Sequence, residues 1–156
     1  MEDSRILVAE QLGEKKRFEF LEHTADAYVA TYGRSLAEAF ENAALAMFEV
    51  MTDVKEVSPI IEDSVEVEAE DEKALLYSWL EALLVKFDTK GVMYSKFRIL
   101  SLGKSPGGLA LKAKAWGESF DPKRHLQKVG VKAVTYHRMQ IINEKNKVTL
   151  KFILDI

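Results

Sequence analysis

The chain has 156 residues, of which 47% are hydrophobic and 30% are charged, and it carries a formal net charge of −3 and no cysteine. This profile is typical of one soluble globular domain and excludes a disordered chain. The missing cysteines exclude disulfides, thiolate zinc sites and a cysteine nucleophile. The negative charge gives no general attraction to phosphate backbones, so we expect any involvement of RNA to be indirect.

The N-terminal segment 1–17 mixes charges with a short apolar patch, and we predict a weakly ordered extension or an added element there. A single domain is then expected over residues 18–156. Acids stand in the first fifteen residues, where a signal peptide would have a basic and then an apolar region. No run approaches the ~20 apolar residues of a membrane span. We therefore expect a cytoplasmic protein.

The first predicted elements are two strands and a helix. Alternating aromatic residues predict strands over 18–20 and 28–32. Ser35 and Glu38 form a capping box for a helix that ends near Met51. Apolar residues recur along that helix at intervals of three and four, which is the stripe of an amphipathic helix.

The second half alternates in the same way. We predict a strand over 65–69 with one acidic face, then a second amphipathic helix over 72–87 that begins after Asp71 or Glu70. A hairpin follows, with strands over 94–102 and 109–115 around the turn 103–108. A last hairpin joins 131–142 to 148–154. The fold class expected is α+β, with two amphipathic helices packed on largely antiparallel β-sheet.

Carboxylates near both ends of the domain are candidates for a metal site. The motif EHTAD holds Glu22, His23 and Asp26, and Asp155 follows an apolar strand just before the C-terminal Ile156. Burying a carboxylate is costly unless a positive group meets it. Converging carboxylates without cysteine favour a hard divalent ion such as calcium, magnesium or manganese. The alternatives are a turn at EHTAD and a frayed, solvated tail.

A basic stretch between residues 121 and 137 forms a second candidate site. It includes Lys123, His125 and Lys132, and it could hold a phosphate or an acidic partner surface. The alternative is a solvated loop leading into a strand. The histidine spacing does not match a zinc motif, and the sequence has no P-loop or GxSxG motif.

Several segments together resemble the archease family. They are FEFLEHTADAYVATYGRSLAEAFENAALAMFEVMTD from Phe18, ALLYSWLEALLVKFDTKG from Ala74, LKAKAWGESFDPKRH from Leu111, VKAVTYHRM from Val131 and the terminal LDI. The resemblance covers residues 18–156. The combination of EHTAD, AKAWGE, VKAVTYH and a chain ending in DI is specific.

This resemblance implies an archease-like α+β fold and a protein that is not itself an enzyme. Its partner would be the RtcB-class tRNA-splicing RNA ligase, whose guanylylation and multiple turnover archeases promote. The family's metal site, with calcium as the expected ion, maps onto Asp26, Asp155 and Ile156. The family's activating positions map onto Lys123, His125 and Lys132, and we add His23 from EHTAD. Relatives commonly carry an acid at the position of Gly130, so its contribution is in doubt here.

Two other functions remain open from the sequence. A metal-dependent phosphoesterase acting alone would use the same carboxylates and would turn over without a ligase. A general chaperone or scaffold would bind partners through a sheet edge or a helix face, with a metal that is only structural. An assay of the purified protein alone would separate the first from a ligase activator.

Overall fold

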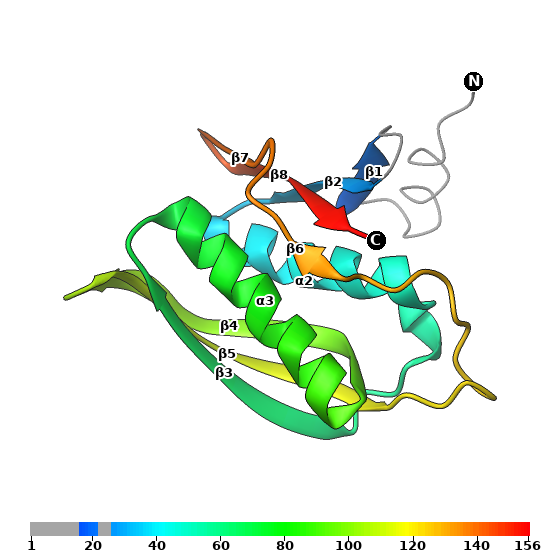
Figure 1. Ribbon diagram of the computed structural model, residues 1–156. Helices are drawn as coiled ribbons and strands as arrows, with labels where there is room; N and C mark the ends of the chain where they lie inside the picture. Colours follow the sequence, from blue (N-terminus) through cyan, green and yellow to red (C-terminus); the bar gives the residue numbers. More distant parts are fainter. Residues whose placement is uncertain (1–15, 22–25) are drawn as a thin grey trace.

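The computed structural model describes residues 16–21 and 26–156. Two helices form a layer between two antiparallel sheets (Figure 1). The expected α+β class is confirmed, and the sheet is divided into two. Most of the predicted extension, and the residues Glu22, His23, Thr24 and Ala25 of EHTAD, lie outside the described residues.

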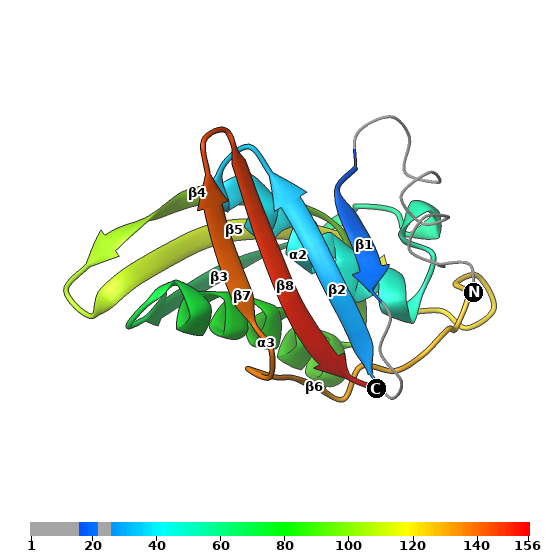
Figure 2. The same ribbon diagram turned by 90° about the horizontal axis from the view of Figure 1, so that it is seen from above.

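The first sheet has the strand order β1-β2-β8-β6, and β7 also pairs with β8. Its strands are β1 (Phe18–Leu21), β2 (Ala27–Gly33), β6 (Ala133–Val134), β7 (Gln140–Glu144) and β8 (Lys147–Asp155). Figure 2 shows β2 and β8 side by side at its centre, with β7 on the far side of β8. The N-terminal and C-terminal parts of the domain therefore share one sheet.

The second sheet has the order β3-β5-β4. It contains β3 (Ile61–Ala69), β4 (Val92–Ser105) and β5 (Gly108–Ser119). The hairpin predicted around 103–108 is present, but its turn is tighter than predicted because β4 continues to Ser105. Gly108 has a φ of 130°, a conformation that favours glycine, and this allows the chain to reverse over so few residues.

Both helices begin as the sequence indicates. Helix α2 (Leu36–Met51) starts at Ser35, whose side chain accepts a hydrogen bond from the Glu38 N–H at 3.1 Å. Helix α3 (Glu72–Lys90) starts at Asp71, whose carboxylate accepts from the Ala74 N–H at 2.8 Å. These side chains satisfy N–H groups that lack partners inside a helix. A short 3₁₀ turn, η1 (Val54–Glu56), follows α2.

The core lies between the two sheets. The largest fully buried side chains include Trp79 of α3, Phe40 and Phe48 of α2, and Phe152 of β8. The indole N–H of Trp79 donates to the Phe40 carbonyl at 2.9 Å, so the two helices share a polar contact as well as packing. A buried indole that keeps its hydrogen bond avoids the cost of burying a polar group.

The prediction of one continuous strand over 131–142 is wrong, because the structure has two separate strands there, β6 and β7. Both strands pair with the same edge of β8, but Val134 faces Leu154 whereas Gln140 faces Lys151. Between these two pairs β8 has only residues 152–153, whereas the other segment has residues 135–139, so the segment between β6 and β7 bulges out of the ladder. Arg138 within it has a φ of 58°, which is incompatible with a continuous strand.

Candidate functional site

Asp26 and Asp155 lie opposite each other at one end of the first sheet. Strands β2 and β8 are antiparallel, and Ala27 pairs with Leu154. Continuing this register by one residue places Asp26 opposite Asp155. Directly opposed residues have Cα atoms roughly 4.5–5.5 Å apart in an antiparallel pair. The C-terminus lies beside the start of β2 in Figure 2, so the two ends of the domain meet as the sequence analysis expected.

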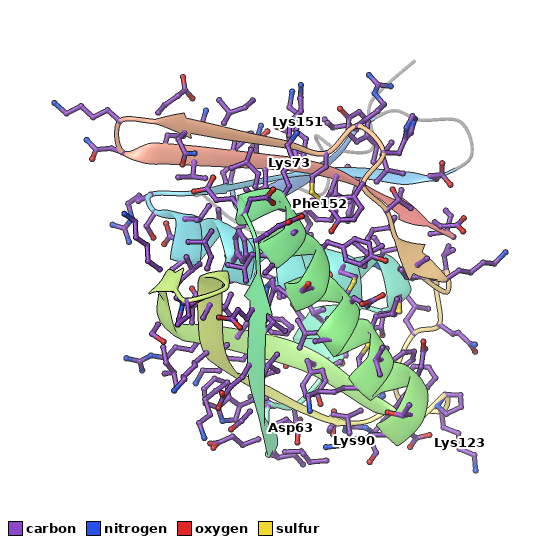
Figure 3. The ribbon with its side chains drawn as sticks, turned by 60° about the vertical axis from the view of Figure 1, so that its left-hand side comes forward. Asp63, Lys73, Lys90, Lys123, Lys151 and Phe152 are labelled. Atoms are coloured by element: carbon purple, nitrogen blue, oxygen red, sulfur yellow. The ribbon has the colours of Figure 1, made fainter. Side chains whose placement is uncertain are left out.

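The Asp155 carboxylate lies on the sheet face that is turned away from the helices. Alternate residues of β8, from Val148 to Leu154, belong to the core, so Asp155 belongs to the other face. Figure 3 shows the same alternation at Lys151 and Phe152, which point to opposite sides of β8. Asp155 is exposed and Asp26 is partly exposed. Both carboxylates can therefore be solvated, or can bind an ion that arrives from solvent.

Ile156 completes this corner. Its side chain packs against the core, which fixes the terminal residue beside Asp155 instead of leaving a frayed tail. Within residues 16–21 and 26–156, no three His, Cys, Asp or Glu side chains come together as a metal site. The oxygen-bearing side chains described at this corner are the carboxylates of Asp26 and Asp155. This all-oxygen set suits a hard divalent ion. His23 lies outside the described residues.

Lys132 lies on the other side of Asp155 from Asp26. Its main-chain N–H donates to the Asp155 carbonyl at 2.7 Å, and the next residue, Ala133, pairs with Asp155. Nearby, the Thr135 hydroxyl donates to the Ile153 carbonyl at 2.9 Å. The VKAVTYH segment and the end of β8 are therefore held together by main-chain and side-chain hydrogen bonds. We name Asp26, Asp155, Ile156 and Lys132 the terminal corner.

His125 and Lys123 occupy another part of the molecule. Lys123 is exposed, and Figure 3 shows it beyond the end of α3 that carries Lys90, whereas Lys151 lies on the opposite side of the molecule. The His125 side chain is 0% exposed and its ring stacks on Phe120 with centroids 5.6 Å apart. A partner cannot contact this ring in the folded structure. His125 instead anchors the basic stretch from inside.

Glu118 of β5 is the centre of this anchor. Its Oε2 accepts hydrogen bonds from the Ser58 N–H at 2.7 Å, from the His125 Nε2 at 2.9 Å and from the Arg124 guanidinium. His125 Nδ1 accepts from the Asp121 N–H at 2.9 Å, so Nε2 carries the proton that His125 donates. We name Glu118, Arg124 and His125 the carboxylate anchor.

The anchor makes the Glu118 carboxyl group a stronger acid. The hydrogen bond from the Ser58 N–H, together with those from His125 and Arg124, lowers the pKa of Glu118 from 4.5 to about 2, although burial alone would raise it. Glu118 was missed in the sequence analysis. A signal was present, because the acid that ends AKAWGE is followed closely in the sequence by the cationic Arg124 and by His125.

Further along, the basic stretch is tied to the end of α2. The Lys128 N–H donates to the Met51 carbonyl at 3.0 Å, and the Lys128 ammonium pairs with Glu49 at 2.7 Å. Gly130 follows in open space, where an added Cβ would meet no atom within 4 Å. The segment from Asp121 to Lys132 is therefore fixed at the carboxylate anchor, at α2 and at β8.

Among the described helices, none is long and apolar enough to span a membrane.

The chain is similar to known proteins over most of its length. A family model described as "Archease protein family (MTH1598/TM1083)" matches residues 18–156. Protein archease of Sulfurisphaera tokodaii is 48% identical over 141 residues, which covers 90% of this chain and 99% of the relative. Protein archease of Thermococcus gammatolerans is 50% identical over 126 residues, covering 81% and 88% of the two chains.

Two solved structures are also similar. The solution structure of Methanobacterium thermoautotrophicum protein 1598 has a TM-score of 0.78 and 45% identity, and the match covers 89% of this chain and 98% of that one. The crystal structure of an archease from Thermotoga maritima, described as a possible chaperone, has a TM-score of 0.53 over 92% of this chain and 99% of its own. At 17% identity, the second likeness shows the fold alone.

Proposed function

The chain belongs to the archease family, and we propose that it activates an RNA ligase of the RtcB class by promoting guanylylation of the ligase and its repeated turnover. In this proposal the protein catalyses no ligation itself and contacts RNA only through the ligase. The observation that supports an activating site is the β2–β8 register, in which Ala27 pairs with Leu154, the neighbours of Asp26 and Asp155.

The proposed site is the terminal corner. Asp26, Asp155 and the Ile156 carboxylate would hold one divalent ion, with calcium expected first and magnesium or manganese as alternatives. When bound, such an ion supplies positive charge that stabilises phosphate oxygens. Lys132 places a cationic side chain on the segment that pairs with Asp155. Together they would present an ion and an ammonium group to the nucleotide phosphates or acidic residues of the ligase.

Lys123 would contribute a second contact from the exposed part of the basic stretch. The carboxylate anchor binds the side chains of Arg124 and His125 to Glu118 at this point, so the backbone beside Lys123 is held in one conformation. His125 would therefore support activation by positioning Lys123, and not through contact with the ligase. His23 is proposed as a further partner residue and lies outside the described residues.

The test replaces Asp26 and Asp155 separately by asparagine and measures ligase guanylylation and calcium binding. We expect both activities to be lost while the unfolding midpoint changes little, because neither carboxylate is buried. Asp88→Asn is the control, since Asp88 is exposed on α3 and does not belong to the first sheet. The purified protein alone should show no turnover of RNA or nucleotides. Normal stimulation by both corner variants would overturn the proposal.

A further inference from the structure

A cavity of about 260 Å³ opens at the end of the first sheet away from the terminal corner. Its lining includes Tyr32 and Gly33, at the end of β2, and Lys147, at the beginning of β8. Strand β2 has seven residues, and a strand rises about 3.3 Å per residue, so the cavity lies roughly 20 Å from Asp26. The two sites therefore cannot share one small ligand.

Cationic side chains predominate in this cavity, although the whole protein is acidic. The lining includes Lys16, Arg17, Arg34 and Lys147 against the single carboxylate of Glu38. These four cations come from separate places in the fold: the residues before β1, the residue after β2 and the start of β8. Their convergence creates a positive potential that a concave surface strengthens.

Two of the four cations lack a carboxylate partner among the described residues. Lys16 pairs with Glu19 at 2.5 Å, and Arg34 lies 3.4 Å from Glu38. Arg17 and Lys147 form no ion pair within the described part of the chain. The Lys147 ammonium instead lies 5.3 Å from the centroid of the Tyr32 ring. A guanidinium and an ammonium beside an aromatic ring are well suited to an anion with several oxygen acceptors.

A second cavity of about 200 Å³ shares Arg17 and Asn42 with the first. Besides the shared residues it is lined by two charged side chains of opposite sign and by polar and apolar ones, namely Glu41, Lys96, Leu45, Ser95 and Phe97. The pair of cavities thus offers a cationic compartment beside a mixed one. This arrangement matches a small molecule with a phosphate at one end and an uncharged body at the other.

We propose that the cationic cavity binds the phosphate group of a small ligand, and that a mononucleotide fills both cavities. Arg17 and Lys147 donate charge-assisted hydrogen bonds to the phosphate oxygens. Arg34 adds positive charge at the rim, where its side chain is 73% exposed. The negative net charge of the chain opposes long nucleic acids, so the ligand is a small phosphate and not a polymer.

The experiment titrates inorganic phosphate, AMP and adenosine separately into the full chain at low salt, with calorimetric detection. We expect saturable binding of phosphate, tighter binding of AMP, and none of adenosine. Equal affinity for phosphate and AMP would reject the filling of the second cavity and keep the phosphate site. Absence of saturable binding by both phosphate and AMP would overturn the proposal.

Variants then locate the site. Arg17→Gln and Lys147→Gln should each weaken AMP binding about tenfold, because each removes a charge-assisted hydrogen bond. Both residues are exposed, so the variants should fold, and their circular dichroism will confirm it. Lys104→Gln is the matched control, since Lys104 is exposed on the distant β4–β5 hairpin. Unchanged affinity in both cavity variants would refute this location, and Asp26→Asn should leave AMP binding intact.

Discussion

Replacing Glu118 by glutamine should destabilise the protein in a way that depends on pH. Glutamine keeps the size of the side chain and can still accept from the Ser58 N–H. It removes the negative charge that binds Arg124 and His125. Because these partners come from the segment after β5, the variant should loosen residues 121–125 more than the core.

The pKa of Glu118 sets an upper limit on the effect. It falls from 4.5 to about 2 on folding, and each pKa unit corresponds to about 1.4 kcal/mol, which gives at most about 3.5 kcal/mol. The Arg124 side chain is 53% exposed, so solvent screens part of its interaction with Glu118. We therefore expect Glu118→Gln to lower the free energy of unfolding by about 1–2 kcal/mol at pH 7.

The sign of the pH dependence follows from the direction of the shift. A carboxyl whose pKa is lower in the folded state stabilises the protein fully above its ordinary pKa. That contribution decreases as the pH falls from 4.5 through about 2. The difference in unfolding free energy between the wild type and Glu118→Gln should therefore be largest at neutral pH and should shrink by about half or more near pH 2.

Urea unfolding at pH 7 and near pH 2 measures this difference, and hydrogen exchange of the 121–132 amides reports on the segment itself. Glu66→Gln is the control, because Glu66 is exposed on β3 and should change the stability by less than about 0.5 kcal/mol. A destabilisation by Glu118→Gln that stays equal at both pH values would refute the charge argument. Unaltered exchange in 121–125 would refute the anchoring role.

Two further substitutions test how the fold is built. Gly117→Ala should lower the free energy of unfolding by about 3 kcal/mol in urea titrations, because an added Cβ would lie 1.9 Å from the Met93 carbonyl oxygen on the paired strand. Gly103→Ala is the control and should change the stability little, because a Cβ there would meet no atom within 4 Å. Equal effects of the two substitutions would contradict this reasoning. Asp71→Ala should lower the melting temperature and the free energy of unfolding, the latter by about 1 kcal/mol, because it removes the side chain that caps the Ala74 N–H. Asp71→Asn should retain most of the stability, since asparagine can also accept this hydrogen bond. An unchanged stability of Asp71→Ala would show that the cap is not needed.

The sequence predicted the helices well because their signals are local. The cap at Ser35 and the apolar stripe that follows lie within one element, and the structure confirms both. The strand over 131–142 could not be resolved in this way. Its bulge arises from pairing with β8, which is a non-local contact, and the apolar run of the sequence gives no sign of it.

The candidate sites show the same limit more sharply. Asp26 and Asp155 were paired through a family resemblance, since residue types alone left a turn and a frayed tail as alternatives. Only the register of β2 with β8 brings them together, and register depends on the alternation of both strands over their whole length. His125 was predicted from its ability to titrate near neutrality and from the family resemblance. The structure buries its side chain, and its ring nitrogens form hydrogen bonds with Asp121 and Glu118.

The carboxylate anchor and the terminal corner are connected through one continuous segment. Glu118 holds this segment at Arg124 and His125, α2 holds it at Lys128, and β8 holds it at Lys132. Between these contacts the chain has little regular structure, so side-chain and end-of-element hydrogen bonds replace a helix or strand in fixing its path. A change at Glu118 should therefore reach Lys123 first, while the hydrogen bond from the Lys132 N–H to Asp155 preserves the corner. Measuring both calcium binding and ligase stimulation for Glu118→Gln would separate the two parts of the proposed site, because only ligase stimulation depends on Lys123.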